Sequence, residues 1–238
     1  MAKVNGNNIR LYVQGDDLSG DANSLDGIGY GNTMLDVTTL DVSANKRIAG
    51  IVSGTVGVNV WFDAAAGRSH ALFTANSGAV PKTDQNVLVP MGSAEGDPSI
   101  HMVAKIANYD VETGVDTAVS ASASFESNSY APQFGEMLTS HQDTHASTTS
   151  GGTVDSGASS ADGGSAVLQV FSIASGTADI KIQHSSNGSA WSDLLTFTAV
   201  TASTSEYVAA TGTVNRYLRC RSTNTFTDLV FAVDFARS

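Results

Sequence analysis

The sequence predicts a nearly all-β protein, and three observations lead to that fold class. Val and Thr are abundant, whereas the common helix formers Leu, Glu, Lys and Arg are sparse. Several segments alternate apolar and polar side chains with a period of two, as strands do. Only 15% of the 238 residues are charged, so the chain can bury cores and is not expected to be disordered.

The first 140 residues are expected to form a sheet with one helix. The helix is predicted over residues 64–75, with Asp63 as its cap and Leu72 and Phe73 facing the core. A Gly- and Asp-rich stretch, residues 15–33, is predicted to be a long polar loop of the kind that is often functional. The strands are expected at residues 8–14, 35–41, 48–62, 86–90, 99–111 and 115–126.

The long strands of this part have one apolar face and one face of small polar residues. In residues 115–126, Ala121, Ala123 and Phe125 are expected to face the core, and Ser122 and Ser124 the opposite side. An ordinary exposed sheet face carries Lys, Glu and Arg. A face of Ser, Thr, Ala and Asn instead fits a smooth wall that packs against a neighbour or lines a channel, although a plain solvent-exposed sheet would also carry it.

The second part of the chain is predicted to be a separate β-sandwich. Residues 146–165 consist almost entirely of Gly, Ser, Thr and Ala, a composition typical of a linker. We therefore expect domains at residues 1–138 and 166–238, joined by a linker at 139–165. Six short strands in the second domain fit a jelly-roll-like sandwich. They are expected at residues 166–173, 179–184, 191–198, 206–209, 214–221 and 228–235, with a turn at Asn187-Gly188.

Charge and cysteine content restrict the function. The formal net charge is −11, most of it in the first part of the chain, so non-specific gripping of DNA is not expected. Cys220 is the only cysteine, which excludes an intrachain disulfide. The sequence opens without the apolar run of a signal peptide and holds no segment long enough for a membrane helix. We expect synthesis in a cytoplasm.

No constellation of catalytic or metal-binding residues stands out. The sequence has no G-x-S-x-G, no P-loop and no G-x-G-x-x-G before a helix. His141 and His145 have an H-x3-H spacing but lack an obvious third ligand nearby, and residues 21–27 resemble a calcium loop only imperfectly. Cys220 is expected to be a packing residue. The sequence therefore predicts neither an enzyme nor a cofactor or metal.

Together these elements resemble the major tail tube protein of long-tailed bacteriophages. The resemblance covers residues 1–138 and depends on the pattern of sheet, one helix and more sheet. It is carried by Leu35-Asp36-Val37-Thr38-Thr39-Leu40-Asp41, Lys46-Arg47, the strand from Gly50 to Val58, Trp61-Phe62-Asp63, and Ala121-Ser122-Ala123-Ser124-Phe125-Glu126. It implies a tail-tube-type β-barrel or sandwich with one helix, and a location in the virion tail after synthesis in the host cytoplasm.

The resemblance also implies a mechanism of assembly. Six subunits form a ring, about four long strands from each build a continuous inner barrel, and the stacked rings carry the genome without binding it tightly. The implied partners are further copies, the tail terminator, the tape measure and the distal tail protein. The residues that this assigns to the lumen are Ser53, Thr55, Asn59, Asp116, Ser120, Ser122, Ser124 and Glu126. Those that it assigns to a ring-stacking loop are Asp16, Asp17, Asp21, Asp26 and Tyr30.

The second domain resembles a discoidin-like, galactose-binding-type sandwich added to some tail tube proteins. The similarity is carried by the hairpin from Ile182 to Trp191, with Asn187 where those domains often have Asp, and by Arg216-Tyr217-Leu218-Arg219. It implies a decoration on the outside of the tube, or else a weak glycan-binding domain. For the whole chain, a carbohydrate-binding or adhesive surface module, a secretion-tube protein and a capsid-decoration protein are also compatible with the sequence.

Overall fold

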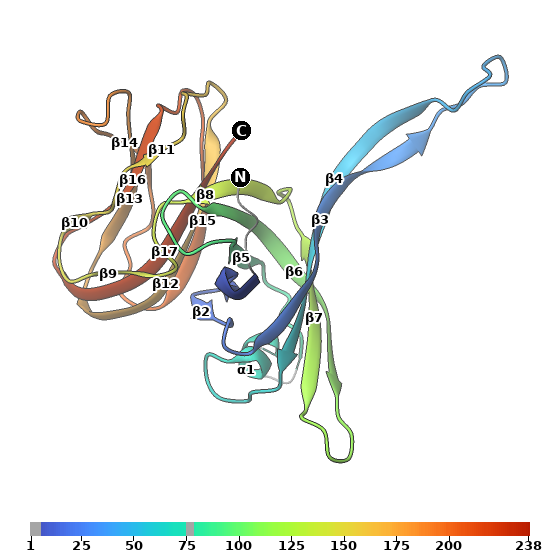
Figure 1. Cartoon of the computed structure of the whole chain (residues 1–238), viewed down its shortest axis with the longest axis horizontal. Helices are drawn as coiled ribbons and strands as arrows, with labels where there is room; N and C mark the ends of the chain where they lie inside the picture. The colour runs from blue at the N-terminus through green and yellow to red at the C-terminus, as the bar shows by residue number, and fades with distance from the viewer. Residues whose placement is uncertain (1–5, 75–78) are drawn as a thin grey trace.

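The computed structural model describes residues 6–74 and 79–238 and is mainly β, as the sequence predicts. The strands form two sheets of twelve and five strands. One end of the molecule is a compact sandwich, and at the other a long hairpin projects far from the body (Figure 1). Among the described residues the α-helix is short, and no helix is long and apolar enough to cross a bilayer.

The part of the chain that carries the projecting hairpin is a set of long antiparallel strands. β3 pairs with β4, β4 with β7, and β7 with β6. The strands are β1 (Tyr12–Val13), β2 (Asp16–Asp17), β3 (Ala22–Asp36), β4 (Arg47–Trp61), β5 (Gln85–Pro90), β6 (Pro98–Glu112), β7 (Ser120–Ser127) and β8 (Gln133–Met137). A 3-10 turn, η1 (Gly6–Asn8), precedes them, and the helix α1 (Ser69–Phe73) follows β4.

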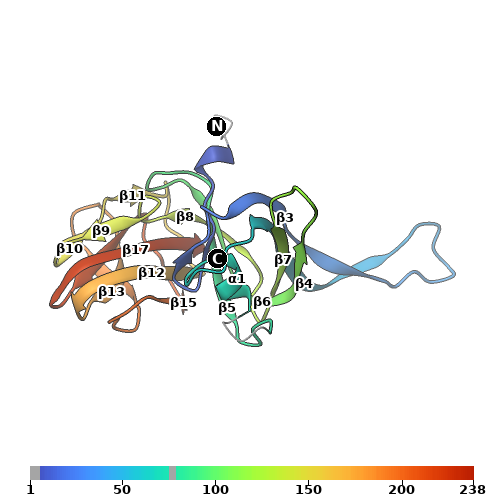
Figure 2. The same cartoon turned by 90° about the horizontal axis from the view of Figure 1, so that it is seen from below.

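The C-terminal part folds as a sandwich whose two sheets enclose one apolar core. β12, β15 and β17 belong to the large sheet, and β13, β14 and β16 to the small one. Its strands are β9 (Asp143–His145), β10 (Thr149–Ser150), β11 (Val154–Asp155), β12 (Gly164–Gly176), β13 (Asp179–Ser185), β14 (Ser192–Thr196), β15 (Thr204–Ala210), β16 (Tyr217–Thr223) and β17 (Phe226–Arg237). All six strands predicted here are confirmed. Figure 2 shows these strands from below, with β12 and β17 side by side.

The Asn187-Gly188 turn is also confirmed. Gly188 has φ +71°, a left-handed conformation that a residue without Cβ adopts at little cost. The Asn187 side-chain oxygen accepts hydrogen bonds from the backbone N–H groups of Ser189 and Ala190, each at 2.9 Å. The loop therefore closes on its own side chain, as Asx turns do.

The predicted polar loop at residues 15–33 is wrong. Most of it belongs to β3, which pairs along its whole length with β4, from Ala22 opposite Val60 to Asp36 opposite Arg47. β3 is Gly-rich and polar because it is exposed on both faces over most of its length, so the alternation that marks a half-buried strand is missing. The true loop lies at residues 37–46, at the tip of the hairpin, and it includes residues 37–41 of the expected strand 35–41.

Three further boundaries differ from the expectation. The helix is only one turn and is capped by Arg68 rather than Asp63, whose carboxylate instead accepts from the Ala65 N–H at 2.9 Å. The expected end of this helix at residue 75 lies outside the described residues. Residues 115–119 form a turn before β7, with Asp116 at φ +61°. In the expected strand 8–14 only Tyr12 and Val13 pair, because η1 occupies its start.

Candidate assembly surfaces

The hairpin of β3 and β4 is the most exposed element of the molecule. We call its outer part, residues 30–53 with the tip loop, the arm. No residue of the arm is buried. Nevertheless it presents large apolar side chains, of which Ile51 is 84% and Tyr30 56% exposed. The others are Met34, Leu35, Val37, Leu40, Val42, Ile48 and Val52. An isolated two-stranded ribbon is marginally stable in water, and such apolar exposure indicates a surface that another molecule covers.

The base of the same hairpin is anchored in the body. On β4, Val56, Val58 and Val60 are buried and contact Ala121, Ala123 and Phe125 in one apolar core. Both sets lie on the apolar faces that the sequence predicts. The arm is thus the continuation of a strand pair whose inner half is fixed by core packing, so it is held outward rather than attached by a linker.

The opposite face of β4, β7 and β6 forms a polar surface, which we call the wall. Asn59 lies opposite Ser122, and Ser122 opposite Asp110. Two pairs further along the same face, Thr55 lies opposite Glu126. Asn59 also donates hydrogen bonds to Ser24 and Asp26 of β3, so the polar surface continues across all four strands. Ser53, Thr55 and Glu126 are exposed, and Asn59, Ser120, Ser122 and Ser124 are half-buried. Asp116 lies beyond the strand end, in the turn.

The two basic residues on the third long strand, β6, do not place a free positive charge on this wall. Lys105 forms an ion pair with Asp84, with Nζ and Oδ1 2.7 Å apart, and donates to the Lys82 carbonyl. His101 is buried and points toward the C-terminal sheets. Between Ile106 and Ser127 the chain has acidic residues but no Lys or Arg. The wall is therefore polar with an excess of negative charge.

The residues expected in a ring-stacking loop lie apart from one another. Asp21 is buried and accepts from the Ser69 N–H at 3.0 Å and from Arg68 at 3.4 Å. Asp16 is half-buried, and burial raises the pKa of its carboxyl. Asp17 accepts from Gln142 at 2.7 Å. Asp26 and Tyr30 are exposed on β3, and the Tyr30 ring lies 5.4 Å from that of Phe134. The geometry does not gather these side chains into one loop.

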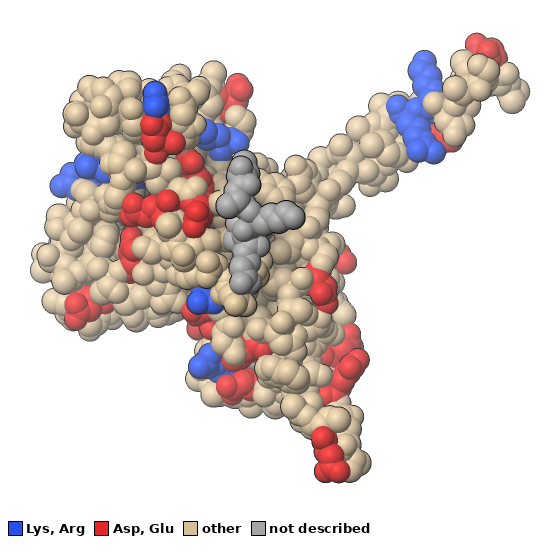
Figure 3. Space-filling view, viewed as in Figure 1, with Lys and Arg blue, Asp and Glu red and all other residues tan. Residues whose placement is uncertain are grey.

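The opposite charges of this part lie at separate extremities. Lys46 and Arg47 lie beside the tip loop of the arm, where Figure 3 shows a basic cluster. The hairpin between β6 and β7 carries Asp110, Glu112 and Asp116, and its end is acidic in the same view. The two hairpins project in different directions from the body (Figure 1). The arm also carries Asp36, which lies opposite Arg47, and Asp41 in the tip loop, so its basic cluster is local and its acidic and basic residues are equal in number.

A Ser–His–Asp geometry is present but fully buried. His101 Nδ1 lies 2.8 Å from Asp234 Oδ2, and its Nε2 lies 2.9 Å from Ser165 Oγ. Ser99 also donates to Asp234, at 2.8 Å, and the Val167 N–H donates to the other carboxylate oxygen at 3.1 Å. The side chains of His101 and Asp234 are 0% exposed, so a substrate cannot reach them in this structure. The buried hydrogen-bond network around His101 connects β6 with β12 and β17. Sequence reasoning did not find it, because these three strands are far apart in the chain.

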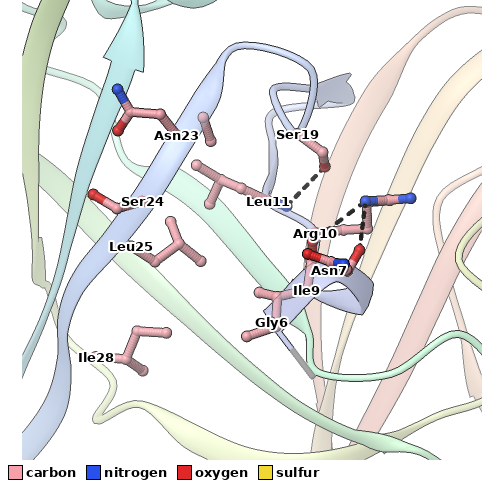
Figure 4. Close-up of a pocket in the computed structure, with 11 residues that line it drawn as sticks. Gly6, Asn7, Ile9, Arg10, Leu11, Ser19, Asn23, Ser24, Leu25 and Ile28 are labelled. Carbon is pink, nitrogen blue, oxygen red and sulfur yellow. Dashed lines mark hydrogen bonds between the residues drawn. The ribbon is translucent and has the colours of Figure 1, made fainter. Parts of the chain in front are cut away.

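A hollow of the N-terminal part lies between the segment before β1 and the strand β3 (Figure 4). Its volume is about 350 Å³, and its lining is mostly apolar, with Ile9, Leu11, Leu25 and Ile28. Arg10 is the one charged residue in the lining, and its guanidinium lies 3.5 Å from the carbonyls of Asn7 and Ile9. We assign no ligand to this hollow.

The spacing of His141 and His145 does not produce a shared metal site. His141 Nε2 donates to the Asn8 carbonyl at 2.8 Å, whereas His145 is buried with Nδ1 2.6 Å from Ser222 Oγ. Cys220 is buried in the sandwich core, as expected. The Trp191 ring is covered by the guanidinium of Arg219, whose Cζ lies 4.2 Å from the ring centre. One face of the Trp191 ring is therefore occupied by a protein cation.

The elements form a mainly β protein with an outward arm, and a search of solved structures finds tail proteins at low similarity. A chain in the virion of the native gene transfer agent particle is 18% identical, with a TM-score of 0.41, and the match covers 56% of this chain and 98% of that one. The Dit hub protein of phage SPP1 is 14% identical, with a TM-score of 0.40, and covers 96% of this chain and 98% of its own.

A third similar structure is the sheath/tube terminator of the extracellular contractile injection system PVC, in the extended state. It is 11% identical with a TM-score of 0.42, and the match covers 56% of this chain and 98% of that chain. No family model and no curated protein matches the sequence. At these identities and TM-scores the likeness assigns neither a fold nor a function to this chain.

Proposed function

We propose that this chain is a structural, non-enzymatic subunit that assembles into stacked hexameric rings, forming a phage-type tail tube for genome delivery. The observation that carries the proposal is the arm: 24 consecutive residues without one buried side chain, yet with large apolar groups on both strands. A monomer leaves this surface in water. If a neighbouring copy covers this surface, burial of the apolar area stabilises the assembly.

The wall fits the inside of such a tube. β3, β4, β7 and β6 supply four long neighbouring strands, and β3 takes the place of the fourth wall strand that the sequence did not identify. Their polar face carries Ser, Thr, Asn and carboxylate groups, and its Lys105 is paired with Asp84. Because every free basic group would form counterion-releasing contacts with phosphates, a wall without them lets DNA slide.

In this proposal the arm reaches the next ring. Lys46 and Arg47 would meet the acidic β6–β7 end of a subunit in the adjacent ring, since both are exposed and opposite in charge. The ring-stacking role expected for residues 15–33 thus passes to the arm and its tip loop, residues 37–46. The terminal rings would contact a tail terminator, a tape measure and a distal tail protein. The C-terminal sandwich would lie outside the tube.

Electron microscopy of the purified full-length protein tests the proposal. We expect hollow tubes with sixfold rings. The matched variant replaces residues 33–51 by Asn-Gly, which joins Asn32 directly to its partner Val52 across a two-residue turn. It removes the outer arm but no buried residue, so we expect a folded subunit that does not form tubes. Tubes of the shortened variant, or monodisperse monomers of the full-length chain, would overturn the proposal.

A further inference from the structure

Three potential metal ligands of different kinds converge at one edge of the C-terminal sandwich. Asp143, His145 and Cys220 each place a donor atom within 4.8 Å of the other two, and this is the one such cluster among residues 6–74 and 79–238. Asp143 and His145 lie on β9, which pairs with β17 of the large sheet, whereas Cys220 lies on β16 of the small sheet. The sequence spacing conceals the cluster, because β9 and β16 are more than 70 residues apart.

The alternation along β9 directs both ligands to the same side. Thr144 is exposed, whereas Asp143 is half-buried and His145 is buried. In a strand, residues two positions apart share a face, so both side chains approach the sandwich interior. An aspartate is an unusual choice for such a position unless it has a partner, because a carboxylate loses hydration there. Its Oδ1 accepts from the Ser140 hydroxyl at 3.0 Å.

The imidazole of His145 is held in one orientation. Ser222 Oγ lies 2.6 Å from Nδ1, and the ring packs edge-on against Phe231 with the centroids 4.9 Å apart. A hydrogen bond at one ring nitrogen fixes the ring and leaves the other for a cation, as is common in metal sites. Burial lowers the pKa of His145, so near neutral pH the ring is in the uncharged form that binds metals.

The thiol of Cys220 has negative neighbours. Burial, and then the Asp143 and Glu95 carboxylates, raise its pKa to about 12. Glu95 Oε1 accepts from the Gly152 N–H at 2.9 Å, and the Gly151 N–H donates to the Cys220 carbonyl, also at 2.9 Å. Two carboxylates beside a buried thiol and a neutral imidazole form a donor set that a divalent cation would neutralise.

We propose that Asp143, His145 and Cys220 bind a thiophilic divalent cation of the zinc type, with water as the fourth ligand. Cysteine sulfur, imidazole nitrogen and carboxylate oxygen are all common zinc ligands, and three protein ligands leave one coordination position. On binding, the S–H bond breaks, the thiolate sulfur coordinates the cation and one proton passes to solvent. Affinity should therefore fall as the pH falls. The bound ion would fasten β9 to β16.

Titration of the full-length protein with Zn²⁺ and Co²⁺ tests the site. We expect one ion per chain, a higher melting temperature with Zn²⁺, and a thiolate-to-metal charge-transfer band with Co²⁺. Cys220→Ser should remove this band, and Asp143→Asn should weaken binding by about tenfold or more. The control is His141→Gln, the other histidine of the H-x3-H pair, which should bind like the unaltered chain. Ser222→Ala should weaken binding by about 10–100-fold through the loss of ring orientation.

Two results would overturn the site. One is the absence of a thiolate-to-cobalt band in the unaltered protein, a measurement that does not depend on any variant folding. The other is an equal loss of binding in His141→Gln and Cys220→Ser, which would indicate binding elsewhere. The inference is independent of the tube, because it concerns the folded subunit. Tube formation without metal binding, or metal binding without tubes, would separate the two proposals.

Discussion

At the scale of single residues, the strand alternation on β7 separates core from wall. Ala121 is buried against the valines of β4, whereas Ser122 lies between Asn59 and Asp110 on the polar face. Adjacent residues therefore have opposite environments, and identical substitutions at the two positions should have opposite effects.

We predict that Ser122→Arg leaves the subunit folded, whereas Ala121→Arg prevents folding. Exposed substitutions usually change stability by less than ~0.5 kcal/mol, although half-buried Ser122 will cost somewhat more. At position 121 an unpaired guanidinium would enter the apolar core. Soluble yield and thermal unfolding measure both effects. In assembled tubes, six Ser122→Arg charges per ring should slow DNA passage in a salt-sensitive way. If Ala121→Arg folds and Ser122→Arg does not, the assignment of the core face and the wall face is the wrong way round.

The buried pair of His101 and Asp234 should be costly to break. Removing one partner leaves the other polar group buried without compensation, for which about 3–5 kcal/mol is typical. We therefore expect Asp234→Ala to lower the urea midpoint strongly, with the m-value measured in parallel. Asp155→Ala is the control, since its ion pair with Arg216 at 2.6 Å is exposed. A comparable decrease of the urea midpoint in the two variants would contradict a stabilising role for the buried network.

Two histidines should make the fold sensitive to mild acid. Burial lowers the pKa of both His145 and His184, and His184 Nδ1 accepts the Asn215 N–H at 3.2 Å. Below pH ~6.5, the unfolded chain binds protons that these folded side chains do not. The stability that the two histidines contribute is thus complete above that pH, and it is lost as the pH falls toward their lowered pKa values. Urea unfolding at several pH values checks this, and replacing both by Gln should flatten the slope, whereas His141→Gln should not.

At the scale of elements, the arm is the feature that makes this chain an assembly candidate. Its base has a core-facing side of valines, but its outer half has none, so propensity and pairing with β3 alone maintain the ribbon. Asp36 and Asp41 of the arm equal its basic pair, Lys46 and Arg47, in number, whereas the β6–β7 hairpin is acidic.

We predict that reversing the charge of the basic pair, Lys46 and Arg47, blocks end-to-end assembly. Lys46→Glu with Arg47→Glu should leave melting unchanged, because both side chains are exposed, but should prevent tubes through like-charge repulsion. Glu112→Lys with Asp116→Lys in the same chain should restore them. The measurement is tube length by electron microscopy at low and high salt. Failure of the second pair to restore assembly would refute this contact between rings while leaving the arm's apolar role intact.

At the scale of the whole molecule, the two parts of the chain are connected through shared structure. β17 pairs with β8, Asp234 opposite Met137, and the large sheet runs through both parts. A small apolar cluster joins them as well. It contains Tyr12, Leu88, Met137, Val167 and Ala232. The division at residues 138 and 166 stays a prediction. The Gly-, Ser-, Thr- and Ala-rich residues between these positions include β9, β10 and β11, which pair with strands of both sheets.

These contacts predict the behaviour of a truncated chain. Residues 1–145 by themselves would lose the partners of His101 and Met137 and would expose Leu88 and Tyr12, so we expect aggregation or a much lower melting temperature. Calorimetry of the fragment and the full chain makes the comparison. A fragment that melts like the full protein and forms tubes would show that the C-terminal sandwich is a dispensable addition.

The sequence by itself determined which segments become half-buried strands. β4, β7, β13 and β16 could be predicted because each has one face against a core, and this leaves a period of two in the residues. The same alternation identified Ala121 and Phe125 as core and Ser122 and Ser124 as the other face. The buried position of Cys220 followed from its alternating strand.

Only the tertiary structure decided the rest, because those features depend on contacts that leave no local pattern. β3 has no buried face over most of its length, so its residues read as a loop until β4 is placed beside it. Residues 99–104 of β6 are buried on both sides because the C-terminal sheets cover the second face, which is why His101 could not be assigned from alternation. The clusters around His101 and His145 combine residues far apart in the chain, and spacing along a sequence carries no record of such distances.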